Sequence, residues 1–397
     1  MPNLILFDEP KIRQQLLPFT FTRPIAEIRI GILAIKEKWE KHLNSKASFL
    51  TDHYLQEKFL LHIEKENLLI NSSVLPDALL LSAINNLKLN ECLVQDETLV
   101  AVYCNDDKAD NFAHHYLTGI FEKKTYNEPL FQVNHVWDIF SKNAAALTAD
   151  FDLITAGRVS QPLNETNTVI GKGKIFVEEG ATVNASIFNT NTGCIYIGKD
   201  AEVMEGSLVR GPFALCEHSA LKLSTKIYGA TTIGPHSKVG GEVNNSVIFG
   251  YSNKAHDGFL GNSVIGEWCN LGADTNNSNL KNNYAEVKLW NYATENFSNT
   301  GLQFCGLFMG DHSKCGINTM FNTGTVVGVS ANIFGSGFPR NFVPSFSWGG
   351  AQGFTTFQVA KAFEVAEKVM ERRGLLLTTT DKKILEHIFY SEEKFRK

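Results

Sequence analysis

Residues 203–239 read VMEGSLVRGPFALCEHSALKLSTKIYGATTIGPHSKV, and they decide the fold of this chain. Apolar residues recur there at every sixth position: Val203, Val209, Leu215, Leu221, Ile227, Ile233 and Val239. An α-helix repeats every 3.6 residues and a strand every two, so neither produces a strict period of six. Six is the period of hexapeptide-repeat β-helices, in which each short strand forms one side of a coil. The stretch therefore predicts a parallel β-helix whose aliphatic residues stack inward.

The same spacing continues on both sides of this stretch, for example at Ile170-Gly171 and Leu271-Gly272. We therefore place the β-helix at residues 168–344. The phase of the repeat breaks near 245–264 and 276–308, which predicts loops that leave the coil. Loops on a repeat scaffold commonly carry binding residues.

The flanking regions follow other patterns. Residues 1–155 have the alternating short apolar runs of an α/β domain with a Rossmann-like arrangement, including an expected helix over 25–43 and a strand over 79–81. After residue 350 the pattern turns helical, which predicts a helical tail over 351–397. Such a tail commonly covers the open end of a coil or packs on a neighbouring subunit.

Composition excludes several classes of function. The 397 residues exceed one ordinary core, and the net charge of −5 comes with no basic stripe for nucleic acid. No uncharged apolar stretch is long enough for a membrane span, and the N-terminus has no expected leader. The seven cysteines are scattered without a C-x-x-C pair, which favours reduced cytoplasmic thiols and no metal site.

Residues 195–335 resemble a known family. Its signature stretch is a histidine, then a tyrosine and a G-D-S-x-I-G turn. Residues 253–266, NKAHDGFLGNSVIG, follow that order, with VRGP at 209–212, NLGADT at 270–275 and NLK at 279–281. The family is that of the bifunctional sugar-1-phosphate nucleotidylyltransferase/acetyltransferases, which resemble UDP-N-acetylglucosamine pyrophosphorylase joined to glucosamine-1-phosphate acetyltransferase.

The resemblance implies a fold and an activity. The fold is a nucleotidyltransferase-like α/β domain followed by a left-handed β-helix. The left hand comes from the family, because most parallel β crossovers are right-handed. The activity is that of a transferase: acetyl-CoA-dependent N-acetylation of an amino-sugar phosphate, coupled or not to sugar-1-phosphate nucleotidyl transfer. Family members are cytoplasmic homotrimers with active sites between neighbouring coils.

The resemblance also assigns roles to single residues. His256 is the candidate catalytic base, since an imidazole with an ordinary pKa of about 6.5 suits proton transfer near neutrality. The resemblance implies a substrate site formed by Arg210, Lys226 and Phe259, and an acetyl-CoA site formed by Asn279 and Ala273. His218 and His236 lie inside hexapeptides and are expected to form coil corners. Asp274 stands where the family has a glycine, so it is expected to crowd the donor pocket.

The N-terminal region departs further from the family. LLPFTFTRP at 16–24 is similar to the R-L-x-P-L-T-x-x-x-P-K stretch of sugar nucleotidyltransferases. The glycine-rich loop whose amides cradle phosphate in those enzymes is replaced by FDEPKIR at 7–13, which contains no glycine. Asp8 and Glu9 there are expected to repel a phosphate. The remaining candidates for nucleotide phosphate are Lys11, Arg13 and Arg23, and Mg²⁺ is expected only if nucleotidyl transfer is retained.

Two other functions fit the same residues. The chain is a nucleotidyltransferase alone, with the β-helix serving as a trimerisation scaffold, or it is a non-catalytic protein that senses sugar nucleotides. The missing glycine loop favours acetyl transfer or sensing over nucleotidyl transfer. The sequence names neither the sugar, the nucleotide base nor the acyl group.

Overall fold

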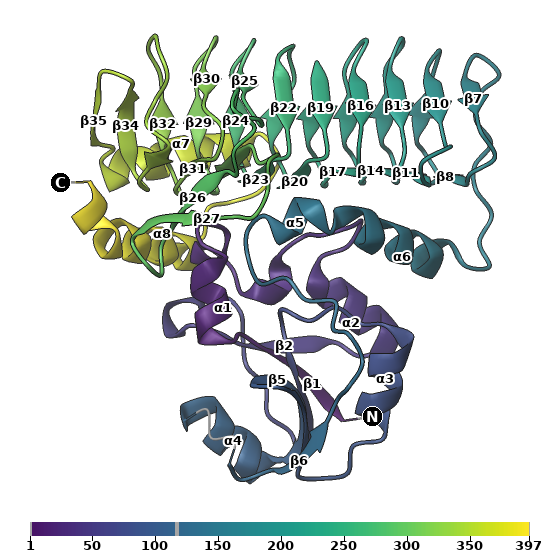
Figure 1. Ribbon diagram of the computed structural model, residues 1–397, viewed down its shortest axis with the longest axis vertical. Coiled ribbons are helices and arrows are strands. Elements are labelled where there is room, and N and C mark those ends of the chain that lie inside the picture. The colour runs from purple at the N-terminus through teal and green to yellow at the C-terminus, as the bar shows by residue number, and fades with distance from the viewer. Residues whose placement is uncertain (1, 116–118, 397) are drawn as a thin grey trace. The chain divides into compact units, whose positions relative to one another are not determined.

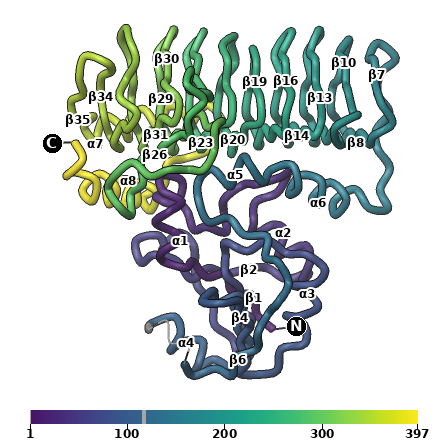
Figure 2. Tube along the Cα trace, viewed as in Figure 1, coloured from purple at the N-terminus to yellow at the C-terminus, as the bar shows by residue number. Residues whose placement is uncertain are grey.

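A computed structural model describes residues 2–115 and 119–396, and the chain divides into two compact units. The first unit contains Met1–Leu16, Thr22–Ile28 and Leu33–His135. The second contains Leu17–Phe21, Arg29–Ile32 and Val136–Lys397. The colour gradients of Figures 1 and 2 follow the chain through both units. Two short N-terminal segments therefore belong to the same unit as the β-helix.

The first unit is built on a mixed six-stranded sheet in the order β2-β1-β3-β5-β4-β6. Its strands are β1 (Asn3–Phe7), β2 (Ala47–Leu50), β3 (Glu66–Asn71), β4 (Glu91–Gln95), β5 (Thr98–Asn105) and β6 (Glu122–Thr125). Strand β1 pairs in parallel with β2 and β3, while β5 is antiparallel to both β3 and β4. Ile5, Phe7, Leu69 and Val102 fill its core with Phe112.

The helices of this unit are α1 (Pro10–Gln15), α2 (Ile35–Leu43), α3 (Ala78–Asn85) and α4 (Asp106–His115). The strand predicted at 79–81 is wrong, because this segment lies in α3. Asp77 caps that helix by accepting a hydrogen bond from the Leu80 N–H, and Leu80 and Ile84 bury one face of it. The apolar run was too short to distinguish a strand from a buried helical face.

The helix predicted over 25–43 begins only at residue 35. Gly31 adopts φ +78°, a left-handed conformation that a continuous α-helix does not contain. In the second unit, the Gly31 N–H donates to Asn143 and the Ile32 N–H donates to Asp150. These amides are therefore bound by side chains and not by a helical turn.

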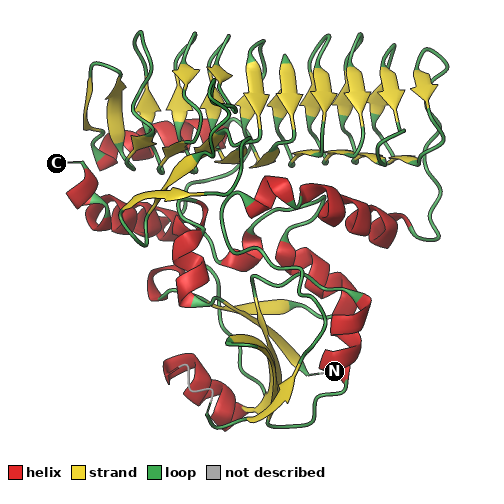
Figure 3. Ribbon diagram, viewed as in Figure 1, coloured by secondary structure: helices red, strands yellow, loops and turns green. Residues whose placement is uncertain are grey.

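The second unit is a parallel β-helix with three faces (Figure 3). The first face contains β7 (Thr168–Ile170), β10 (Ile187–Asn189), β13 (Leu208–Arg210), β16 (Lys226–Tyr228), β19 (Glu242–Asn244) and β22 (Phe259–Gly261). The second contains β8 (Ile175–Val177), β11 (Ile195–Ile197), β14 (Phe213–Leu215), β17 (Thr231–Ile233), β20 (Val247–Gly250), β23 (Val264–Glu267), β28 (Leu307–Met309), β31 (Thr325–Val327) and β33 (Phe342–Val343). The third contains β9 (Thr182–Val183), β12 (Glu202–Val203), β15 (Ala220–Leu221), β18 (Lys238–Val239), β21 (Asn253–Lys254), β24 (Asn270–Leu271), β29 (Lys314–Cys315), β32 (Asn332–Ile333), β34 (Ser347–Gly350) and β35 (Gly353–Thr356).

The period of six is confirmed as the inward-facing set of this coil. All seven residues from Val203 to Val239 lie in its core, and each is at most 2% exposed. They stack in register, as in the pairing of Leu215 with Ile233. The predicted fold class, an α/β domain followed by a parallel β-helix of hexapeptide repeats and a helical tail, is likewise confirmed.

Corners of the coil are made by residues in the left-handed conformation. His218 and His236 both have positive φ, three residues after the inward-facing Leu215 and Ile233, so both are corner residues as predicted. Their rings stack in a row with those of Tyr251 and Trp268, with centroids 4.8, 4.8 and 4.3 Å apart. Each ring lies directly over the one in the coil before it.

The phase breaks have two different causes. Within 245–264 the chain stays in its ladders, and Ile233 pairs with Ile248 because that coil is shorter. The predicted loop there is therefore wrong. Within 276–308 a segment does leave the coil, and it contains the antiparallel pair β26 (Lys288–Asn291) and β27 (Asn296–Asn299). Strands β25 (Asn276–Asn277) and β30 (Met320–Phe321) form a separate parallel pair, and β25 contacts β22 of the first face.

The α-helices in the described part of the second unit are α5 (Asp138–Ser141), α6 (Asn143–Thr155), α7 (Val359–Glu371) and α8 (Thr379–Ser391). At the start of α6, Asn143 Nδ2 donates to the Ala230 carbonyl and to Thr232 Oγ1, which fixes this helix on the second face. Among the described residues, no helix combines the length and hydropathy needed to span a membrane.

Candidate functional site

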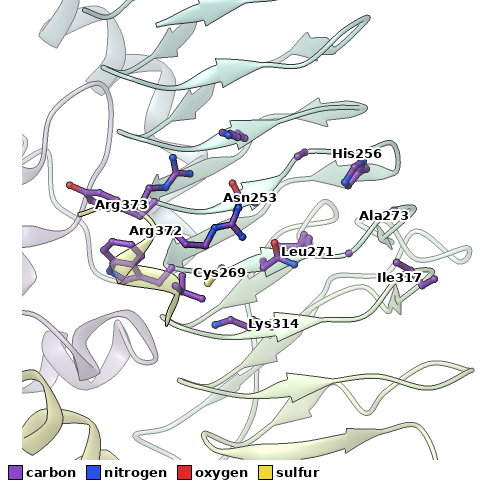
Figure 4. A pocket seen from close by; sticks show the side chains of 16 residues that line it. Asn253, His256, Cys269, Leu271, Ala273, Lys314, Ile317, Arg372 and Arg373 are labelled. Carbon is purple, nitrogen blue, oxygen red and sulfur yellow. The ribbon is translucent and has the colours of Figure 1, made fainter. Parts of the chain in front are cut away.

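A cavity of about 690 Å³ lies on the third face of the β-helix. Strands β18, β21, β24 and β29 form its floor, and the end of α7 with the turn after it contributes Val369, Arg372 and Arg373 to its wall. Figure 4 shows that the two arginines lie at one end of the lining, while His256 and Ala273 lie at the other. The cavity is therefore elongated along the strands.

The arginine end of the cavity carries a concentration of positive charge. Arg372 and Arg373 share the lining with Lys238 and Lys314, and no carboxylate is among the residues that line it. Within the described part of the chain, none of the four makes an ion pair. Burial lowers the pKa of Lys314 to about 8. Cations gathered without counter-charges favour binding of an anion, and arginine suits phosphate in particular.

His256 lies at the opposite end, just after β21. Its side chain is exposed, and no hydrogen bond to its imidazole ring occurs in the described structure. Ala273 lines the same cavity one coil further along. The structure thus brings together two of the residues predicted from the sequence, the candidate base and one candidate for the acetyl-CoA site.

Arg210 and Lys226 lie elsewhere. Both are exposed on the first face, where they line a separate groove of about 690 Å³ with Tyr228 and Glu242. Lys226 is the register partner of Glu242, and the Tyr228 hydroxyl donates to Glu242 at 2.5 Å. Burial, followed by this hydrogen bond, raises the pKa of Tyr228 to about 12. Within one chain, these cations therefore do not share a cavity with His256.

Phe259 and Asn279 lie near each other at the far end of the first face. A Cβ atom at Gly261 would meet the Phe259 ring at 2.4 Å and the Asn279 amide at 2.8 Å, so glycine is needed between them. Asn279 Nδ2 donates to Asn262 Oδ1 at 2.8 Å. Neither Phe259 nor Asn279 lines the third-face cavity.

Asp274 is an exposed corner residue with φ +56°. Aspartate tolerates this conformation better than most residues, which explains how it replaces a glycine. It is not among the residues that line the third-face cavity, although its neighbour Ala273 is. The expectation that Asp274 crowds this pocket is therefore not supported by the geometry.

In the first unit, Asp8 and Arg13 form a buried pair 3.2 Å apart. Asp8 also accepts hydrogen bonds from the Ile25 N–H and the Thr51 hydroxyl, and Arg13 donates to the Tyr54 hydroxyl at 2.9 Å. Burial raises the pKa of Asp8, and the positive charge of Arg13 opposes that shift. The predicted repulsion of phosphate by Asp8 is therefore wrong, because Arg13 balances its charge.

Three further charged residues near the N-terminus, Glu9, Lys11 and Arg23, differ in their surroundings. Glu9 caps α1 by accepting a hydrogen bond from the Ile12 N–H at 2.8 Å. Arg23 is buried, and its carbonyl oxygen accepts a hydrogen bond from Arg13. Lys11 is exposed. Of the three predicted phosphate ligands, only Lys11 therefore reaches solvent freely.

Sequence reasoning missed the cationic end of the cavity. Its lysines come from β18 and β29, and its arginines come from the turn after α7, more than a hundred residues further along the chain than Lys238. One signal was available: the adjacent Arg372 and Arg373 precede Gly374, which adopts φ +71° at the end of α7. A basic pair at a helix end indicates a binding residue only when its neighbours in space are known.

Comparison with known proteins agrees with the two-part organisation. Residues 4–159 match the family model of sugar nucleotidyl transferases. A bifunctional sugar-1-phosphate nucleotidylyltransferase/acetyltransferase of Sulfurisphaera tokodaii is 31% identical over 144 residues, which cover 36% of this chain and 35% of that protein. The bifunctional protein GlmU of Methanocaldococcus jannaschii is 31% identical over 196 residues, covering 49% of this chain and 41% of that protein. The resemblance inferred from the sequence is confirmed.

The matched regions span well under half the length of these relatives. Among solved structures, the UDP-N-acetylglucosamine acyltransferase of Francisella novicida is 14% identical, with 58% of this chain and 78% of that chain covered and a TM-score of 0.32. A similarity this loose supports no statement about activity or assembly.

Proposed function

We propose that this protein is a transferase that moves an acetyl group from acetyl-CoA to the amine of an amino-sugar phosphate. The observation that carries the proposal is the elongated third-face cavity, with cations at one end and His256 at the other. The strand and corner from Tyr251 to His256 span roughly 15 Å at about 3.3 Å per residue. The ligand that fits is long, with phosphates at one end and a reacting group at the other.

Acetyl-CoA has this form. Its phosphates would lie against Arg372, Arg373 and Lys238, and its thioester would lie near Ala273 and His256. Arginine binds phosphate oxygens through a planar fork, while lysine supplies a point charge. Arg373 is the better-buried arginine of the pair, so its bonds to phosphate are less screened by water.

The chemistry assigned to His256 is that of a general base. The acceptor amine attacks the thioester carbonyl, a C–N bond forms, and the C–S bond breaks. The imidazole takes the proton that the nitrogen loses and returns it to the departing thiolate. A positioned base of this kind contributes about 10²–10⁴-fold to the rate.

The acceptor site is proposed to be completed by a second copy of the chain in a homotrimer. Arg210 and Lys226 are exposed on the first face, and the same face exposes Ile187, Leu208 and Tyr228 to between 37% and 47%. A neighbouring coil packed there would cover these apolar side chains. It would also bring the cations of one copy towards the catalytic residues of another.

The test is an assay of thiol release from acetyl-CoA by the full-length protein, with glucosamine-1-phosphate and then other amino-sugar phosphates as acceptors. Acceptor-dependent release supports the proposal. Hydrolysis without an acceptor, or no release with any acceptor, contradicts it. Hydrolysis without an acceptor would mean that His256 activates water. No release with any acceptor would favour the sensor function.

Nucleotidyl transfer is the second candidate, because residues 4–159 match the sugar nucleotidyl transferase family. Against it stand the missing glycine loop and the use of Arg13 by Asp8 and Tyr54. The experiment is isothermal titration of the full-length protein with UTP and with dTTP in the presence of Mg²⁺. Micromolar binding would indicate a phosphate site built differently from the family loop.

A further inference from the structure

One position in an inward-facing row of the β-helix is occupied by a lysine. On the third face, Val203, Leu221 and Val239 stack in register, and the next residue in the row is Lys254. Leu271 continues the row on the following coil. Lys254 is only 2% exposed. An ammonium group inside an apolar stack is strongly unfavourable unless its hydrogen bonds are satisfied.

The Lys254 ammonium bonds to two backbone carbonyls at a corner of the coil. Its Nζ atom donates to the Gly240 oxygen at 2.9 Å and to the His256 oxygen at 2.8 Å. In the described structure, no backbone N–H donates to either of these two carbonyls. The lysine thus ties the backbone at His256 to the preceding coil.

This lysine has no carboxylate within ion-pair distance among the described residues. Burial lowers the pKa of Lys254 to about 8, and the more distant Asp257, Asp274 and Cys315 oppose that shift. An apolar residue of similar size in such a position is often neutral or stabilising. The two hydrogen bonds to carbonyls offset part of the cost of burying the ammonium, so an apolar residue of similar size should leave the stability of the core little changed.

His256 itself lacks an orienting partner. No group in the described structure hydrogen-bonds its ring, so the direction of the imidazole depends on the backbone that carries it. That backbone is held through the one carbonyl that Lys254 binds. A catalytic base is usually oriented by a third group that contacts its ring.

We propose that Lys254 is a positioning residue for His256, acting from inside the coil through the His256 carbonyl. The inference rests on the proposed function of His256 as the base. The ammonium fixes the peptide plane after His256 and thereby the angle at which the imidazole enters the cavity. The group that orients the base is thus a buried lysine that binds the main-chain carbonyl of His256. In most such sites the orienting group contacts the ring of the base itself.

The test is Lys254→Met in the full-length protein, because methionine keeps the length of the side chain and removes its charge. We expect the melting temperature to change little, because removal of the buried ammonium offsets the loss of its hydrogen bonds to the Gly240 and His256 carbonyls. We expect kcat to fall about tenfold, since a misplacement of 1 Å can cost about 10²-fold, while KM for both substrates changes less than about twofold. In NMR spectra, the His256 Cε1–H resonance, assigned with a His256→Gln variant, should shift.

Leu221→Ala is the matched control, since it alters the same row two coils away. It opens a cavity and should lower the melting temperature, but it should move neither kcat nor the His256 resonance. The proposal is overturned if Lys254→Met keeps the wild-type kcat, or loses activity only in proportion to its folded fraction. If the wild type transfers no acetyl group, the proposed function fails, and an unshifted His256 resonance in Lys254→Met would then overturn the positioning role separately.

Discussion

At the scale of single residues, His256 carries the proposed chemistry. It stands at the end of the cavity that is opposite the cations, and its ring is exposed to that cavity. His218 and His236 occupy corners of the same coil, but their rings stack on each other 4.8 Å apart and line no part of the cavity. Its place in the cavity therefore distinguishes His256, the proposed base, from His218 and His236.

The first prediction concerns this base. His256→Ala should lower kcat for acetyl transfer by about 10²–10⁴-fold and leave KM nearly unchanged, because the base acts mainly in the transition state. Steady-state kinetics with acetyl-CoA and the best acceptor measure both constants. His218→Ala is the control and should keep more than half of the wild-type rate. A His256 variant that also keeps half the rate would show that another group takes the proton.

The buried Lys254 predicts an unusual dependence of stability on pH. Its pKa is about 8 in the folded state and 10.5 when unfolded, so between these values the unfolded chain binds more protons. Stability from this group therefore rises with pH from about 8 to 10.5, and the penalty present below pH 8 is about 3 kcal/mol. Denaturant unfolding of the wild type and of Lys254→Met at pH 7.5 and 10 measures it, and Lys314 titrates equally in both. A stability difference that does not change with pH would contradict the shifted pKa.

At the scale of elements, the tail helix α7 was expected to cover an end of the coil or a neighbouring subunit. In the structure, its C-terminal end lines the third-face cavity. The sequence predicted a helical tail here, and α7 is a helix that buries Ala362, Ala366 and Met370. The sequence could not predict that the turn after α7 places Arg372 and Arg373 at strands of the third face, since no periodicity encodes which coil a tail covers. The sequence also could not show that Arg210 and Lys226 lie on a different face from His256. Within one chain they line a separate groove.

The second element-scale lesson comes from the short coil. The period of six predicted the core row from Val203 to Val239, because each step in that run contributes one inward-facing residue. It failed over 245–264, where fewer residues complete a coil and Ile248 still pairs with Ile233. A sequence period records the number of residues per turn, whereas the ladder only requires that strands stay in register. A coil with fewer residues and a segment that leaves the coil therefore interrupt the six-residue period in the same way.

The α7 arginines give the third prediction. Arg372→Ala combined with Arg373→Ala should raise KM for acetyl-CoA by at least about 100-fold, with kcat changed much less, because hydrogen bonds to a charged phosphate contribute about 1.5–3 kcal/mol each. Lys361→Ala is the matched control, since it removes a charge from the same helix where Lys361 pairs with Glu364. With acetyl-dephospho-CoA as the donor, the ratio of the variant's KM to the wild-type KM should be smaller than with acetyl-CoA, because this donor lacks one phosphate. An unchanged KM would place the donor's phosphates elsewhere.

At the scale of the whole molecule, the first face predicts assembly. The chain should form a homotrimer, because Ile187, Leu208 and Tyr228 leave an apolar strip exposed on a flat face of the coil. Light scattering coupled to size-exclusion chromatography should give three times the 44.1 kDa mass of the chain. Leu208→Glu should dissociate the trimer, whereas Leu223→Glu, at a site 64% exposed outside that strip, should not. A monomer mass across a wide concentration range would contradict this assembly.

The interleaving of the two units has a consequence for the newly made chain. Arg29 donates from its Nε atom to the Phe249 carbonyl, 220 positions later, and Phe19 packs its ring 5.1 Å from that of Phe249. A ribosome adds about 5–20 residues per second, so roughly 10–45 s separate the synthesis of Arg29 from that of its partner. During this interval Phe19 lacks its ring contact with Phe249, and Phe21 lacks its contact with Tyr292. Residues 19–29 thus reach their native contacts long after they are made, and the second unit cannot fold strictly in the order of its synthesis.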